Sequence, residues 1–309
     1  MGVMSESAMY FWDNRKPWMK EGYGLEHFEL SKETGRPVLH ISRPQGLAAL
    51  YGHLKVYARR KRWYSDKKKQ RHTIDTPAHL YCRGECDYHE HLVPSLLRDS
   101  DGRADIRIRL EAGELLENLF QEHFKGRMAR FQADDYSAVL QHYGIKTPWI
   151  DLVDNLFVAV WFALNMSYRL DERQRKYAES PHPFGWIHFI HTEREGEHRL
   201  KVADLRAEYH PLSLRPHVQH GIAATRRTKS SWDNKGVDLS PYILASVRIP
   251  NNCQFRVLGK MFTQEFLFPS ITQDHTYNVL LTKEVEDLVR SVGERSRYQY
   301  VELGQILKY

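Results

Sequence analysis

Residues 141–166 read QHYGIKTPWIDLVDNLFVAVWFALNM, and this stretch decides the fold. Before it, Asp134 and Asp135 are suitable N-cap residues for a helix that runs through His142, and Gly144 is the type of residue that ends one. Residues 147–152 then favour extended chain, whereas residues 155–166 are almost all apolar and predict a buried helix. A helix, an extended segment and a buried helix in succession indicate mixed α and β structure.

Signals on both sides of this stretch extend the pattern. Helix signals follow Ser42-Arg43-Pro44 and cover residues 111–124 and 284–292. Strand signals cover residues 78–83, 185–191 and 242–249, and the polar residues 169–183 predict a surface connection. Helices gather in the first half of the chain and strands in the second.

This distribution predicts an α+β fold with mixed or antiparallel sheets and a helical N-terminal part. We expect three parts along the chain: an N-terminal extension at residues 1–40, one domain at residues 41–295 and a tail at residues 296–309.

The composition excludes several classes of protein. Among 309 residues, 41% are hydrophobic and 27% are charged, which excludes disordered, collagen-like and coiled-coil chains. The three cysteines exclude a disulfide scaffold and predict a reducing, cytoplasmic location. The longest apolar run, residues 156–164, is far shorter than the ~20 residues that span a membrane, so we expect no membrane partner.

The positive charge is concentrated in one segment, residues 55–71, which we call the basic segment. It holds nine Lys or Arg and one acid, while the rest of the chain carries 36 basic and 38 acidic residues. With Trp63 and Tyr64 in its middle, it fits a DNA or RNA backbone. A solvated loop is the alternative interpretation. The residues expected to contact nucleic acid are Arg59, Arg60, Lys61, Arg62, Lys67, Lys68 and Lys69.

Common catalytic and metal-binding motifs are missing. The chain has no dinucleotide glycine motif, phosphate loop, nucleophile elbow or HExxH zinc motif. Cys82, Cys86, His89 and His91 lie within ten residues, but their spacing matches no common zinc module. We therefore predict no metal site.

Three separated segments carry the remaining functional signal. The first is Tyr81-Cys82-Arg83-Gly84-Glu85 with Pro94-Ser95-Leu96 after it. The second is Gln141-His142-Tyr143-Gly144-Ile145-Lys146-Thr147 with Asp151 and the apolar helix. The third includes Gln219-His220-Gly221 and Gln264-Glu265-Phe266-Leu267-Phe268-Pro269. From about residue 40 to residue 290, the chain resembles the FRG domain family, named for a Phe-Arg-Gly motif in which Cys82 here replaces Phe.

The resemblance implies a divergent ADP-ribosyltransferase fold with NAD as the substrate. It also implies a bacterial or phage-related toxin or defence effector. Cleavage of the nicotinamide–ribose bond needs a cation on the pyrophosphate and a carboxylate near the ribose. The expected catalytic carboxylate is Glu265, with Glu85 as the second candidate. The expected NAD-binding residues are Arg83, Gly84, Gln141, His142, Tyr143, Thr147 and Gln219, the last of which we expect in an inner strand.

Each of these residues also has a structural interpretation. Arg83 could form a salt bridge with Glu85 or Asp151, and Asp151 itself fits a structural role better than a chemical one. Glu265 could be a surface residue near a turn. The acceptor of the ADP-ribosyl group could be a nucleic-acid base or a protein side chain. A non-enzymatic module that binds a nucleotide or nucleic acid is the main alternative, and a nuclease is a weaker one.

Overall fold

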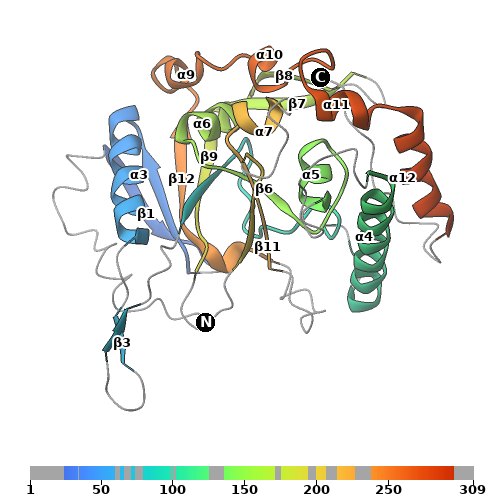
Figure 1. Cartoon of the computed structure of the whole chain (residues 1–309). Helices are drawn as coiled ribbons and strands as arrows, with labels where there is room; N and C mark the ends of the chain where they lie inside the picture. Colours follow the sequence, from blue (N-terminus) through green and yellow to red (C-terminus); the bar gives the residue numbers. More distant parts are fainter. Residues whose placement is uncertain are drawn as a thin grey trace.

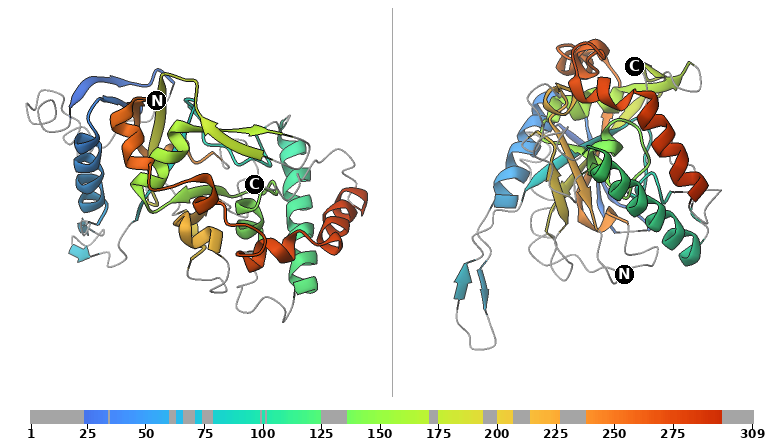
Figure 2. Two further views of the ribbon diagram at one scale, coloured as in Figure 1. Left: turned by 90° about the horizontal axis from the view of Figure 1, so that it is seen from above. Right: turned by 45° about the vertical axis from the view of Figure 1, so that its right-hand side comes forward.

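The structure is a computed structural model. It describes residues 24–33, 35–59, 63–65, 71–73, 79–98, 100, 102–124, 136–170, 175–193, 200–206, 214–226 and 238–295. Its main feature is an eight-stranded sheet with helices packed around it (Figures 1 and 2).

The strands of this sheet run in the order β1-β2-β12-β9-β5-β6-β11-β10. Their bounds are β1 Leu25–Leu30, β2 Pro37–Ile41, β5 Leu80–Glu85, β6 Ile150–Val153, β9 Phe184–His191, β10 Lys201–Asp204, β11 Gly221–Thr225 and β12 Ile243–Pro250. Neighbouring strands are antiparallel except β12 and β2, which are parallel. The predicted α+β class is confirmed.

The sheet nearly separates between β5 and β6. Strand β5 pairs with β9 along its whole length, from Leu80 to Glu85. Its pairing with β6, in contrast, consists of one residue pair, Cys82 with Val153. A five-stranded part and a three-stranded part therefore meet at this pair and diverge beyond it.

Helix α6 (Leu156–Leu164) packs on one face of the larger part. It begins there because the Asn155 side chain accepts hydrogen bonds from the amides of Phe157 and Val158. A Cβ at Gly84 would lie 1.9 Å from the Ala159 carbonyl oxygen, and one at Gly185 would lie 2.3 Å from that of Ala163. The two glycines therefore allow the helix backbone to contact β5 and β9 directly.

Two expectations around the end of α6 were wrong. The helix does not continue to Met166, because Asn165 adopts an extended conformation and starts β7 (Asn165–Arg169). The stretch at residues 169–183 is not only a surface connection, since it contains β8 (Arg175–Glu179), which pairs with β7 in a separate two-stranded sheet.

Two groups of helices form separate cores with the sheet. Helices α3 (Pro44–Arg59) and α9 (Cys253–Gly259) share an apolar core with α6. Helices α4 (Gly102–Phe124), α5 (Tyr136–His142), α11 (His275–Leu280) and α12 (Lys283–Arg295) form a second core beside the smaller part of the sheet (Figure 1). The short helices α7 (Leu214–Val218) and α10 (Gln264–Leu267) and the 3-10 helix η1 (Ser240–Tyr242) complete the described helices.

The N-terminal part differs from its prediction. Its first described elements are strands β1 and β2, not helices. Strand β2 pairs with β12, so the described residues before position 41 belong to the main sheet.

Another strand pair, β3 (Trp63–Ser65) with β4 (Arg71–Thr73), lies apart from the sheet, below α3 in Figure 1. Among the described helices, none is long and apolar enough to cross a membrane.

Candidate functional site

Arg83 lies where β5 and β6 diverge. Its Nη1 donates to the carbonyl oxygen of Asp151 on β6 at 2.7 Å, and its Nε donates to Glu85 Oε1 at 2.7 Å. Within the described residues Nη2 has no hydrogen-bond partner, and the side chain is 23% exposed. The guanidinium is therefore fixed on two sides and reaches solvent on a third.

Glu85 is the buried counter-ion of Arg83. Its Oε2 lies 3.1 Å from His89 Nδ1 and 3.4 Å from His188 Nε2. Burial raises the pKa of Glu85, but Arg83 and the two histidines outweigh this effect and hold the pKa well below its ordinary value. The salt bridge that we considered for Arg83 is thus present, and both oxygens of Glu85 are occupied.

A row of polar side chains supports this pair from the neighbouring strands. Arg83 on β5 is directly opposite His188 on β9, which is opposite Ser246 on β12. His188 is fully buried, with Nδ1 2.8 Å from Ser246 Oγ. Burial lowers the pKa of His188 despite the nearby Glu85 carboxylate. Ser246 and His188 therefore stabilise the orientation of Glu85, which in turn holds Arg83.

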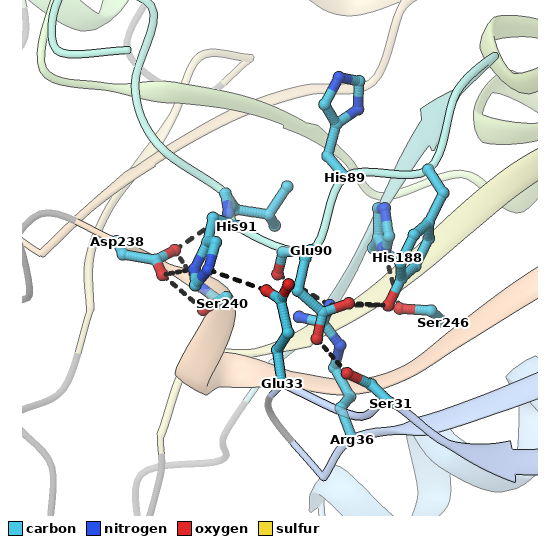
Figure 3. A network of polar contacts seen from close by, with 12 residues as sticks. Ser31, Glu33, Arg36, His89, Glu90, His91, His188, Asp238, Ser240 and Ser246 are labelled. Atoms are coloured by element: carbon cyan, nitrogen blue, oxygen red, sulfur yellow. Dashed lines mark hydrogen bonds and ion pairs between the residues drawn. The ribbon is translucent and has the colours of Figure 1, made fainter. Parts of the chain in front are cut away.

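The loop after β5 is anchored by a second polar network, shown in Figure 3. The Glu90 side chain contacts Ser31 and Arg36, and the Arg36 Nη2 donates to the Glu90 carbonyl oxygen at 2.8 Å. One residue further, His91 Nδ1 lies 2.7 Å from Asp238 Oδ2. These contacts tie the loop to the β1–β2 connection and to the segment before η1, so they fix the chain that leaves the Arg83-Gly84-Glu85 motif.

The predicted residues of the second segment meet on the β6 side of Arg83. Gln141 at the end of α5 accepts hydrogen bonds from Ser95 Oγ, from the Thr147 amide and from Thr147 Oγ1. Its Nε2 donates to Asp151 Oδ2 at 3.4 Å, and His142 Nδ1 lies 3.5 Å from Asp151 Oδ1. The Asp151 side chain is 35% exposed. Its carboxylate is therefore held from one side and accessible from another.

Two residues that were predicted to bind NAD, Gly84 and Tyr143, lie at positions where they pack against other parts of the protein. The position of Gly84 under α6 means that its missing side chain makes room for the helix rather than for a ligand. Tyr143 is fully buried, and its hydroxyl donates to Asp274 at 2.9 Å. The Arg215 guanidinium lies over the Tyr143 and Tyr277 rings, 4.4 Å from each centroid. Burial first, and then Asp274, raises the pKa of Tyr143 well above its ordinary value.

The third segment is separate from the Arg83 contacts. Gln219 is not in an inner strand as expected, because it lies in the turn between α7 and β11, just before His220 with φ 51°. Its Nε2 donates to the Leu267 carbonyl oxygen at 2.6 Å. Glu265 is exposed on α10, and within the described residues it has no hydrogen bond or ion pair with another predicted site residue. Its catalytic role stays a prediction.

Most of the residues expected to contact nucleic acid lie outside the described residues. Arg60, Lys61, Arg62, Lys67, Lys68 and Lys69 are among those not described. Lys55 is described, and its Nζ is 2.8 Å from Asp154 Oδ1.

Among the described side chains, no group of three or more His, Cys, Asp or Glu could hold a metal ion. Cys82 is buried, whereas Cys86 is half-buried.

Sequence reasoning missed the roles of His188 and Ser246. A histidine inside the apolar strand 184–191 was the available signal, but only the strand register shows that it is opposite Arg83. For Asp151 the sequence favoured a structural role, with Arg83 as one possible partner, and the Asp151 backbone carbonyl does bind Arg83, while its carboxylate is partly exposed.

One of three comparisons with known proteins found a match, and it covers the middle of the chain. The family model of the FRG domain matches residues 78–172. The matched range contains Arg83, Glu85, Gln141, His142 and Asp151, so the resemblance seen in the sequence is confirmed there. A search of curated proteins and a search of solved structures gave no significant match.

Proposed function

We propose that this chain, which contains an FRG domain, binds NAD where β5 and β6 diverge and transfers its ADP-ribosyl group to an acceptor. One observation carries the proposal: the Arg83 guanidinium is fixed by Glu85 and by the Asp151 carbonyl, while its Nη2 has no hydrogen-bond partner among the described residues and the side chain is partly exposed. A preoriented guanidinium with a free edge suits a phosphate oxygen. The ADP-ribosyltransferase likeness of the family supplies NAD as the phosphate-bearing molecule.

The residues around Arg83 fit the needs of this chemistry. The buried Glu85 neutralises Arg83 and keeps it in place. Ordering the guanidinium when a pyrophosphate binds therefore costs little free energy. The Asp151 carboxylate is the partly exposed acid beside it, and the Gln141 and His142 side chains hold it. In this proposal Asp151 accepts a hydrogen bond from a ribose hydroxyl. Thr147 contributes indirectly, because its amide and hydroxyl donate to Gln141 and so orient it.

The transfer breaks the bond between ribose C1′ and the nicotinamide nitrogen, and its electron pair leaves with nicotinamide. Positive charge develops on the ribose, and a nearby carboxylate stabilises it. The acceptor then forms a bond to C1′ and loses its proton to solvent. Glu85 is poorly suited to touch the ribose because both its oxygens have partners, which leaves Asp151 and, from the sequence prediction, Glu265 as candidates.

The acceptor is proposed to be a nucleic-acid base brought by the basic segment, with a protein side chain as the other candidate. The family's occurrence in bacterial and phage conflict supports a defence or toxin role. Both statements rest on the sequence, since the nucleic-acid-binding residues lie mainly outside the described part.

The test is release of nicotinamide from NAD by the purified chain, alone and with DNA, RNA or a cell lysate. We expect release with the wild type and loss with Arg83→Ala, while Arg290→Ala on the exposed face of α12 keeps it. Circular dichroism checks that each variant is folded. NAD binding without release or label transfer would favour the non-enzymatic module, and no NAD binding by the folded wild type would overturn the proposal.

A further inference from the structure

We propose a second ligand site, independent of the NAD site, in a cavity of about 350 Å³ on the outer side of α6. Residues from α6, the start of β7, β8, α9 and the chain after α9 line it. They are Val160, Trp161, Leu164, Asn165, Glu179, Cys253, Arg256, Gly259, Lys260 and Phe262. Cavities of this size are typical of small-molecule sites. The ligand that its chemistry favours is a small aromatic carboxylate.

The cavity is separated from Arg83 by the body of α6. Ala159 and Ala163 face the sheet, where they meet Gly84 and Gly185. Val160 and Leu164 come about 100° further round the helix, so they line its other side. Helix α9 packs on this side of α6 (Figure 1). Arg83 is not among the lining residues, so a ligand here would not contact it directly.

Aromatic side chains form a rigid wall of the cavity. The Trp161 ring packs against Phe162 and Tyr177, with centroids 5.2 and 5.0 Å away, so its orientation is fixed. Phe262 contributes a second ring, which contacts Phe266. These ordered indole and phenyl rings can make stacking and edge contacts with a planar ring of a ligand at low entropic cost.

The charges at the cavity favour an anion. Arg256 is committed to Glu179 and donates from Nε to Asn251 Oδ1 at 2.8 Å. Lys260 is exposed, and within the described residues it has no ion pair. The lining therefore carries one net positive charge, located at a lysine without a counter-ion. A carboxylate attached to the aromatic ring would supply that counter-ion.

The exposed thiol of Cys253 lies in the lining and makes the test site-specific. The experiment follows alkylation of Cys253 by N-ethylmaleimide with mass spectrometry, with and without 2-naphthoate. Cys86, which lies outside the cavity, serves as the reference thiol in the same molecule. We expect 2-naphthoate to slow alkylation of Cys253 in a saturable way and to leave Cys86 unchanged.

Two comparisons test the proposed chemistry. The neutral 2-naphthamide should protect Cys253 less well than the acid. The Lys260→Gln variant should weaken protection by the acid about fivefold, as expected for an exposed ion pair, whereas Lys283→Gln on α12 should not. No protection, or equal protection of Cys253 and Cys86, would overturn the site. Equal protection by acid and amide would overturn its preference for an anion.

Discussion

Arg83 and Asp151 are joined by a hydrogen bond across the point at which β5 and β6 part. The Arg83 Nη1 donates to the Asp151 carbonyl oxygen at 2.7 Å, only one residue beyond the Cys82–Val153 pair that holds the two strands together. The side chain thus satisfies a backbone acceptor on the side of β6 where β5 no longer pairs with it. Arg83 therefore has a structural function whether or not it also binds a ligand.

The first prediction concerns Gly84. Substitution by Ala would place a Cβ 1.9 Å from the Ala159 carbonyl oxygen, and neither backbone can move freely in this core. We expect Gly84→Ala to lower the free energy of unfolding by about 2 kcal/mol or more, as overpacked cores do. Urea denaturation measures the change.

Gly52 in α3 is the matched control for Gly84. A Cβ there meets no atom within 4 Å, so Gly52→Ala should raise stability by about 0.5–1 kcal/mol through the helical backbone alone. An unchanged unfolding midpoint for Gly84→Ala would show that α6 does not contact β5 as described.

The second prediction concerns the pH dependence of stability. The pKa of Glu85 in the folded protein lies below its ordinary value of 4.5, chiefly because Arg83 overcomes the effect of burial. The unfolded state therefore binds more protons in acid, and the stability due to Glu85 is lost as pH falls through the folded pKa. Above the unfolded pKa this contribution is fully present.

The Glu85→Gln variant should therefore be less stable than the wild type at neutral pH, and the difference should shrink in acid. Thermal unfolding measured from neutral to acidic pH gives this difference directly. Glu265→Gln is the control, because Glu265 is an exposed carboxylate with no ion pair in the described structure. A difference for Glu85→Gln that is constant with pH would contradict the ion pair with Arg83.

Local signals allowed much of the fold to be predicted from the sequence. Pro44 and Gly144 mark helix ends near α3 and α5, and the structure has those helices there. Strand β1 escaped detection because only Leu25 of its residues is buried, so its side chains do not alternate between core and solvent. The turn at Gln219 was taken for a strand because the left-handed residue after it is His220, not glycine.

The site was harder to predict because its contacts join distant residues. Arg83 and Asp151 are 68 positions apart, and Tyr143 meets Asp274 across 131 positions. A tyrosine before a glycine gave no sign that its hydroxyl is bound inside a buried core. Arg83 and Gln141 could be chosen because their segments resemble the FRG domain family, but which of them face a ligand depends on strand pairing that no short sequence pattern contains.

The third prediction tests the basic segment. Replacing Arg59, Arg60, Lys61 and Arg62 by Glu should weaken nucleic-acid binding and flatten its salt dependence. Each lost contact to a duplex phosphate lowers the slope of log affinity against log salt by about 0.9. Fluorescence anisotropy at several salt concentrations measures the slope. Nicotinamide release without nucleic acid should persist, and a wild-type slope would mean that these charges are only solvated.

The last prediction separates the carboxylates. Asp151→Asn keeps the backbone carbonyl that binds Arg83, and its amide oxygen can still accept from Gln141. If Asp151 stabilises the ribose charge, this variant should release nicotinamide about 10²–10³ times more slowly, because it loses one preorganised electrostatic group. Its affinity for NAD should change far less, since the charge matters mainly in the transition state.

The other two carboxylates should behave differently in the same assay. Glu85→Gln frees the Arg83 side chain, so it should weaken NAD binding as well as turnover. If Asp151 is the catalytic carboxylate, Glu265→Gln should leave both near the wild-type level, because Glu265 is exposed on α10 and makes no ion pair with the Arg83 group in the described structure. Slow turnover in Glu265→Gln with normal turnover in Asp151→Asn would return the catalytic role to Glu265, and full activity in all three would exclude the proposed transfer mechanism.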